Sequence, residues 1–114
     1  MKHEGDRGEA LAARFLQEQG LRIVEKNYRC RQGEIDLVCR DGSTLVFVEV
    51  RLRRSGGFGG AAESITAAKR RRLIQAARHY LARLGETPPC RFDAVLLKEL
   101  DTAGIEWVRD AFSA

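Results

Sequence analysis

Two acidic residues in apolar surroundings are the strongest candidates for chemistry in this sequence. Asp36 lies in the run Gly33-Glu34-Ile35-Asp36-Leu37, and Glu49 lies in the run Val48-Glu49-Val50-Arg51. Acidic residues inside apolar strands are costly unless they have partners. A hard divalent ion joins such carboxylates and keeps its other positions for water and phosphate oxygens. The residue types therefore suggest a Mg²⁺ or Mn²⁺ site suited to phosphodiester hydrolysis.

The spacing of two predicted strands decides whether the two acids can meet. The strands span residues 34–40 and 44–52 and flank Asp41-Gly42-Ser43, a strong hairpin signal. A two-residue loop at Asp41-Gly42 makes Asp36 the diagonal neighbour of Glu49, and a four-residue loop places the two opposite each other. A three-residue loop reverses the faces. Glu34 is expected on the same face as Asp36, because strand residues two apart face the same way. The alternative interpretation is a hairpin whose acids form ion pairs with Arg40, Arg51 or Arg53.

Glu9 and Lys69 are further candidates, one on each predicted helix. A helix is predicted from Asp6 to Gln19, with Gly20 as its left-handed cap, and Glu9 lies at the margin of its apolar face. A second helix is predicted from about Thr66, a plausible N-cap, to Leu84, with Gly85 ending it. Lys69 lies near its start and could reach a phosphate there. The alternatives are an exposed helix glutamate and a lysine that extends along apolar surface to water.

Basic residues gather in two clusters, and the formal net charge is +4. Such clusters attract phosphate backbones, although each could also be a solvated surface. Charge therefore favours nucleic acid as the partner class. The clusters are Arg51, Arg53 and Arg54, and Lys69, Arg70, Arg71 and Arg72; all of these except Arg71 are candidate contacts.

The remaining features favour one ordinary cytoplasmic domain over residues 1–114. No apolar run is long enough to span a membrane, and the charged start is unlike a signal peptide. Three cysteines lack zinc-ligand spacing and are expected to be reduced. Further strands are predicted at 21–28, 91–98 and 105–109, and a glycine-rich loop at 55–60. The order α-β-β-β-α-β-β indicates an α/β fold in which helices flank both sides of a mixed sheet.

Several ordered motifs resemble the YraN family of bacterial proteins over essentially the whole chain. That family is similar to the PD-(D/E)xK restriction-endonuclease-like superfamily, near the Holliday junction resolvases. The motifs are Gly8-Glu9-Ala10, the run from Asn27 to Val38, the run from Leu45 to Arg51, Phe58-Gly59-Gly60, the run from Lys69 to Leu73, and the run from Pro89 to Asp93.

The resemblance implies specific roles for the candidates. Asp36 and Glu49 match the metal-binding acids of the superfamily, and Glu9 resembles the additional glutamate of the resolvase branch. Arg51 stands where the E-x-K element usually has lysine. Arginine stays protonated, so it can hold a phosphate but cannot act as a base. Lys69 could supply the missing ammonium. The resolvase branch also implies a homodimer.

Three hypotheses follow for the activity. The leading one is a nuclease-fold protein that binds DNA, branched or otherwise structured, and cleaves it with Mg²⁺ or Mn²⁺. The glycine-rich loop would close over the substrate. The second is an inactive nucleic-acid binder that keeps the fold. The third is a protein-interaction module, which the salt dependence of DNA binding would distinguish, because phosphate contacts release counterions.

Overall fold

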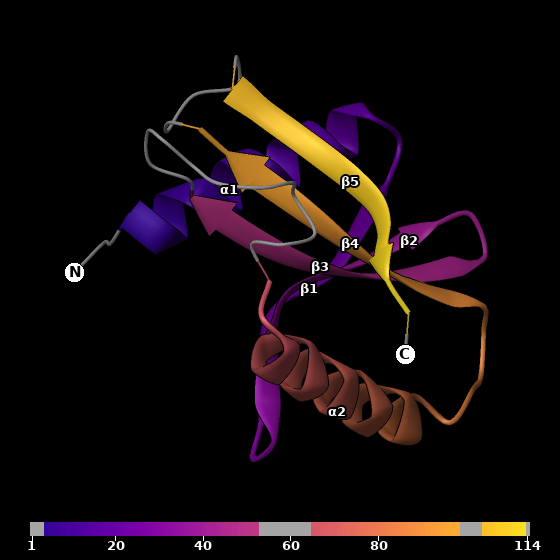
Figure 1. The fold of residues 1–114 in the computed structure, drawn as a ribbon. Helices are drawn as coiled ribbons and strands as arrows, with labels where there is room; N and C mark the ends of the chain where they lie inside the picture. The colour runs from indigo at the N-terminus through magenta and orange to yellow at the C-terminus, as the bar shows by residue number, and fades with distance from the viewer. Residues whose placement is uncertain (1–3, 53–64, 99–103, 114) are drawn as a thin grey trace.

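The chain folds into five strands and two helices in the order that the sequence predicts. A computed structural model describes residues 4–52, 65–98 and 104–113, with side chains from residue 7 onward. Arg53, Arg54 and the glycine-rich loop lie outside these residues. The elements are α1 (Glu4–Glu18), β1 (Arg22–Cys30), β2 (Gly33–Asp41), β3 (Thr44–Leu52), α2 (Ala67–Leu84), β4 (Cys90–Leu97) and β5 (Ile105–Phe112) (Figure 1).

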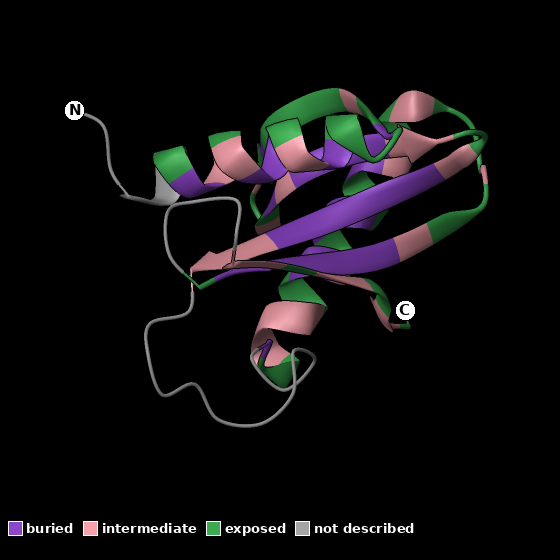
Figure 2. Cartoon of the chain, turned by 90° about the horizontal axis from the view of Figure 1, so that it is seen from above, coloured by how far each residue is buried: buried purple, intermediate pink, exposed green. Residues whose placement is uncertain are grey.

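The strands form one mixed sheet in the order β1-β2-β3-β4-β5. β3 and β4 are parallel and are connected through α2, whereas the other neighbours are antiparallel. β3 lies at the centre, and its residues from Leu45 to Val48 are buried on both faces (Figure 2). This confirms the prediction of an α/β fold with a mixed sheet between helices.

The two helices cover opposite faces of the sheet, each over its own apolar cluster. On the α1 side, Ala12 and Leu16 are buried against Leu37, Val46 and other residues of the strands. On the α2 side, a separate cluster holds buried residues of that helix and the sheet, including Leu73, Ala77, Tyr80, Val38 and Phe47. The sheet is therefore covered twice, as the apolar character of both faces of β3 predicts.

The predicted helix caps are present. Gly20 has φ +101°, and backbone bonds from Leu21 to Leu16 and from Gly20 to Gln17 close the end of α1. Thr66 accepts a bond from the Lys69 backbone N–H at the start of α2, and Gly85, with φ +76°, ends that helix. No helix in the described ranges is long and apolar enough to cross a lipid bilayer.

The hairpin between β1 and β2 changes direction part of the way along. Asn27 has φ +54°, and the β2–β3 ladder ends at the pair Leu37 and Val48, so the β1–β2 pair continues alone. Beyond this bend Ile35 belongs to the α2-side cluster, although Leu37, two residues further along β2, belongs to the α1-side cluster. The simple alternation of faces therefore fails at this point. Glu34, predicted to share a face with Asp36, lines a different cleft.

A buried carboxylate, Asp93, connects β4 to β5. It accepts bonds from the Arg91 Nε atom, the Trp107 Nε1 atom and the Asp110 backbone N–H, at 2.9–3.2 Å. Arg91 also pairs with Asp41 at 3.1 Å. Each donor compensates the carboxylate for the water that it has lost, so Asp93 has a structural role.

The Asp93→Ala variant should lose about 3–5 kcal/mol of unfolding free energy, because it leaves the charge of Arg91 poorly compensated. Asp41→Ala is the matched control and should lose at most about 1 kcal/mol, since Asp41 is partly exposed. Urea denaturation followed by the fluorescence of Trp107, the only tryptophan, measures both losses. Equal small losses in the two variants would show that Asp93 does not hold β5 to the sheet.

Candidate metal and phosphate site

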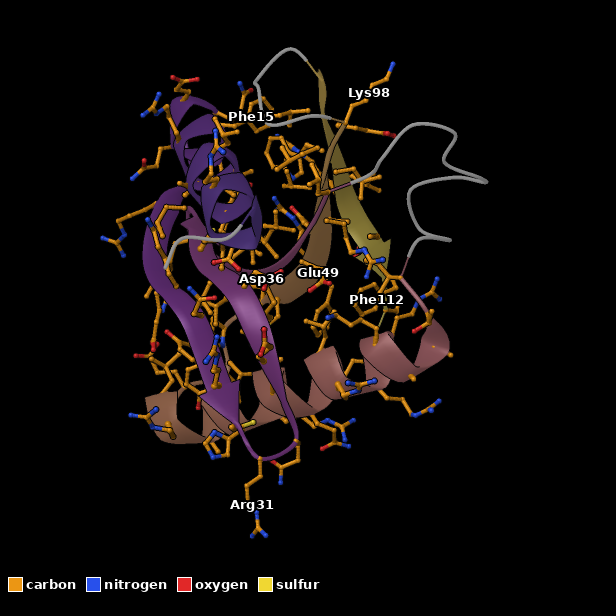
Figure 3. All side chains as sticks on the ribbon, turned by 90° about the vertical axis from the view of Figure 1, so that its left-hand side faces the viewer. Phe15, Arg31, Asp36, Glu49, Lys98 and Phe112 are labelled. Carbon is orange, nitrogen blue, oxygen red and sulfur yellow. The ribbon has the colours of Figure 1, made fainter. Side chains whose placement is uncertain are left out.

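Asp36 and Glu49 meet where β2 leaves β3. The last pair of the β2–β3 ladder is Leu37 with Val48, and Asp36 and Glu49 are the next residue beyond it on each strand. The Val50 backbone N–H donates to the Asp36 Oδ2 atom at 2.8 Å, so a side chain takes the place of a strand partner. The charges of Asp36 and Glu49 act on each other: burial and, after it, the negative charge of Asp36 raise the pKa of Glu49. The two side chains lie side by side between the two helices (Figure 3).

The hairpin turn sets this pairing. Asp41 pairs with Thr44, which leaves a two-residue loop at Gly42-Ser43, one residue later than the two-residue loop considered from the sequence. Gly42 has φ +62°, as the first loop position of a type II′ turn requires. Extended past the last pair, Leu37 and Val48, this register would place residue 36 opposite residue 49, as a four-residue loop predicts. The observed turn therefore supports the direct pairing rather than the diagonal one.

The two carboxylates face an open cleft of about 270 Å³ that several elements build. β2 and β3 provide the acids, α1 contributes Gly8 and Glu9, and the start of α2 contributes Lys69. Arg51 and Leu52 extend the wall along β3. Five of the residues singled out from the sequence thus line one cavity: Glu9, Asp36, Glu49, Arg51 and Lys69.

Two cations lie beside Glu49. The Lys69 Nζ atom is 3.4 Å from the Glu49 Oε2 atom, and the Arg51 Nη1 atom is 3.9 Å from the same oxygen. The Glu49 side chain is 4% exposed, whereas those of Lys69 and Arg51 are 34% and 41% exposed. The acid is therefore buried while both cations extend toward solvent. From there they can reach an anion that enters the cleft.

The electrostatics of the pair favour a bound proton or cation. Burial and, after it, the charge of Asp36 raise the pKa of Glu49 from 4.5 to about 8, while Lys69 acts in the opposite direction. Burial also raises the pKa of Asp36, against the hydrogen bond from Val50. Without a cation, the two acids therefore retain a proton near neutral pH.

The structure does not bring every predicted site residue into this cleft. The Arg70 Nε atom donates to the Ile65 carbonyl, and the Arg70 guanidinium lies 5.6 Å from the centre of the Phe112 ring. Arg72 lines a second cleft. Within residues 4–52, 65–98 and 104–113, no three His, Cys, Asp or Glu side chains form a ready metal-binding group. Glu9 lines the cleft, and its role as a third ligand remains a prediction.

Sequence reasoning missed the contributions of Val50 and Gly8. The Val50 backbone N–H orients Asp36, and Gly8 lies in the wall of the cleft. A backbone donor leaves no signal in residue type. Gly8 precedes Glu9 in the predicted helix, and a glycine inside a helix is unfavourable unless something needs the space. That cost was the one signal at this position, where Gly8 is buried in the structure.

Comparison with known proteins assigns the family. The profile of the family described as "Uncharacterised protein family UPF0102" matches residues 8–97. A UPF0102 protein of Methylobacillus flagellatus is 60% identical over 114 residues and covers 100% of both chains. One from Nitrosomonas europaea is 59% identical over 110 residues, covering 96% of this chain and 93% of its own.

The site and fold are thus those of an α/β protein with a buried acid, Glu49, and a half-buried acid, Asp36, in one cleft. The chain belongs to the UPF0102 family, which confirms the resemblance to YraN-like bacterial proteins.

The raised pKa of Glu49 predicts a specific pH dependence of stability. Between pH 4.5 and about 8 the folded protein holds a proton that the unfolded chain has released. The unfolding free energy should therefore fall as pH rises through this window, by up to about 1.4 kcal/mol per pH unit for one proton. The Glu49→Gln variant should show a flatter curve in urea titrations with divalent ions chelated.

The matched control is Glu86→Gln, which changes an exposed glutamate after α2. It should follow the wild-type curve. A Glu49→Gln curve parallel to that of the wild type would mean that Glu49 ionises as freely in the folded protein as in the unfolded chain.

Proposed function

We propose that this protein binds DNA in the cleft and cleaves its phosphodiester backbone with Mg²⁺ or Mn²⁺ held by Asp36 and Glu49. One observation carries the proposal: the buried carboxylate of Glu49 and the half-buried carboxylate of Asp36 line the same open cleft, and burial together with the charge of Asp36 raises the pKa of Glu49. Such an arrangement is unfavourable when both acids are ionised, and a divalent cation relieves it.

The donor set fits such an ion. The Asp36 Oδ2 atom accepts the Val50 N–H, and both Asp36 and Glu49 line the cleft, so a cation would have carboxylate oxygens from two strands. Mg²⁺ is usually held by one or two carboxylates and completes its shell with water and substrate phosphate. Two protein carboxylates in an open cleft match this usual coordination of Mg²⁺. Zn²⁺ is disfavoured, because zinc sites rely on Cys or His ligands and the described lining of this cleft includes neither.

The contrast with Asp93 supports a functional role for Glu49. Both are buried acids in the described part of the sheet. Asp93 is satisfied by Arg91, Trp107 and a backbone N–H. Glu49 instead faces a second acid and two partly exposed cations. A carboxylate with only a structural role would not be stabilised by a second acid beside it.

When bound, a divalent ion polarises a phosphate oxygen and lowers the pKa of a water molecule. The protein side chains then have distinct roles. Asp36 is held by the Val50 N–H and lines the cleft, where it would bind the ion. Arg51 can hold a nonbridging phosphate oxygen with its planar guanidinium.

Lys69 is the better candidate for the role that lysine has in E-x-K sites. Its Nζ atom is closer to Glu49 than the guanidinium of Arg51 is. A compact ammonium can change its protonation state, whereas a guanidinium cannot. Lys69 would orient the attacking water or protonate the leaving oxygen from α2.

Two further observations support a nuclease-like fold and DNA as the substrate. The element order matches the one expected for a restriction-endonuclease-like core, and the net charge of +4 favours a polyanion. Branched DNA and a homodimer are the further expectations from the resolvase branch.

The Asp36→Asn variant should lose Mg²⁺-dependent cleavage by at least about 100-fold, since even outer-shell changes at metal sites cost 10–100-fold. It should still bind DNA, because the substitution removes a negative charge. Fluorescently labelled four-way junctions and linear duplexes, incubated with Mg²⁺, Mn²⁺ or EDTA, measure the cleavage. Glu18→Gln, an exposed change on α1, is the control. Cleavage by Asp36→Asn at the wild-type rate would refute the metal site.

Arg51→Lys and Lys69→Gln distinguish an active enzyme from an inactive binder. If Lys69 supplies the ammonium, Lys69→Gln should lower cleavage by about 100-fold or more, as expected for a positioned proton-transfer group. Arg51→Lys should then change it little. If the wild type is silent and Arg51→Lys gains activity, the site is a degenerate one that retains DNA binding. Cleavage unaffected by Lys69→Gln would exclude its proposed role.

A further inference from the structure

A second cleft, of about 330 Å³, lies between the end of the β1–β2 hairpin and the start of α2. Arg29, Cys30 and Glu34 line it from the hairpin, and Lys69 and Arg72 line it from the helix. The hairpin passes beside α2 in two views (Figures 1 and 3), and Arg31 lies at its tip (Figure 3).

Close contact between the hairpin and the helix forms this cleft. A Cβ atom placed on Gly33 would lie 2.6 Å from the Arg72 carbonyl oxygen, which is closer than real Cβ atoms approach. Only glycine at position 33 therefore allows the present separation of hairpin and helix. The bend at Asn27 directs the hairpin toward α2, so Arg29 and Arg72 come to the same cavity from different elements.

The charge of the second cleft is positive. Lys69, Arg29 and Arg72 contribute three cations, and Glu34 contributes one carboxylate. Glu34 pairs with Arg29 at 3.7 Å, but both side chains are exposed, at 48% and 71%. Exposed pairs of this kind are weak, so a polyanion can compete for the guanidinium. The excess of two positive charges attracts phosphate.

Lys69 lines both cavities and therefore joins them. A chain of phosphates that leaves the carboxylate cleft past Lys69 meets Arg72 and Arg29 next. The described residues that line the second cleft include no aromatic ring on which a base could stack. Its contacts suit the sugar–phosphate backbone and carry no sequence preference.

We infer that the second cleft binds the phosphate backbone of the polynucleotide on one side of the cleaved bond, through Arg29 and Arg72. This inference rests on the proposed function and extends it. It gives the bound strand a path, from the carboxylate cleft past Lys69 to the β1–β2 hairpin. It also gives the hairpin, which extends beyond the sheet, a role in binding.

Binding measured without cleavage tests the path. Fluorescence anisotropy of labelled single-stranded and duplex oligonucleotides, with EDTA present, gives Kd as a function of salt. Loss of one phosphate contact should lower the slope of log K against log salt by about 0.9 for duplex or 0.7 for single strands. At roughly 0.1 M salt that change corresponds to about an eightfold weaker Kd for duplex. Arg72→Gln and Arg29→Gln should each show this smaller slope and this weaker Kd.

Arg78→Gln is the matched control, because it removes the same charge from an exposed position of α2 that lines neither cleft. It should keep the wild-type slope. If Arg72→Gln and Arg29→Gln bind like Arg78→Gln, the inference is wrong. Displacement of DNA by inorganic phosphate far beyond that by chloride at equal ionic strength would also overturn it, since the cleft would then be a site for free phosphate.

Cys30 provides a second readout inside the cleft. Cys39 is buried, and burial raises the pKa of its thiol to about 12, so it should not react. In a Cys90→Ser background, saturating DNA should slow the alkylation of Cys30 by iodoacetamide. Arg72→Gln should lose this protection at the same DNA concentration. Unchanged labelling of Cys30 by saturating DNA would show that the strand does not pass here.

The two proposals can fail separately. If Asp36→Asn retains cleavage while Arg72→Gln weakens binding, the metal site is wrong and the second cleft stands. If Asp36→Asn abolishes cleavage while Arg72→Gln binds normally, the metal site stands and the strand takes another path.

Discussion

The separation of β2 from β3 at Asp36 is the constraint on which the rest of the structure depends. The ladder between the two strands ends at the pair Leu37 and Val48. Beyond it, the Val50 N–H on β3 donates to the carboxylate of Asp36 instead of to the backbone of β2. A central strand that loses a neighbour inside a sheet must satisfy its backbone in another way. Asp36 does so, and the gap that results is the cleft. The same bend carries the hairpin to α2, where Gly33 permits contact.

The cleft combines burial with incomplete charge compensation. Glu49 is as buried as a core residue, yet its neighbours are Asp36 on one side and two partly exposed cations on the other. Asp93 shows what full compensation looks like in the same sheet. A protein tolerates such local cost where function requires it. The helices that enclose the pair also provide Glu9 and Lys69, so one architecture assembles acids and bases from four elements.

Most of the fold could be predicted from the sequence, because local signals agreed with one another. Gly20, Thr66 and Gly85 marked helix ends through backbone geometry that the structure reproduces. The strand predicted at 21–28 is irregular in the structure: the β1 register shifts between Ile23 and Glu25, and Val24 is exposed. The end of β5 lay three residues beyond the prediction, because Asp110, with φ +53°, bends the strand and keeps it bonded to Asp93.

The candidate site was predictable only as a set of residues. Hairpin register brought Asp36 to Glu49, but the bend that excludes Glu34 depends on Asn27 and on tertiary contact, which alternation cannot reveal. The most direct measurement of the central claim is the anomalous scattering of crystals soaked in Mn²⁺. The account predicts one strong peak between the carboxylates of Asp36 and Glu49, with oxygens of both as ligands. Ordered carboxylates without a peak between them at saturating Mn²⁺ would contradict it.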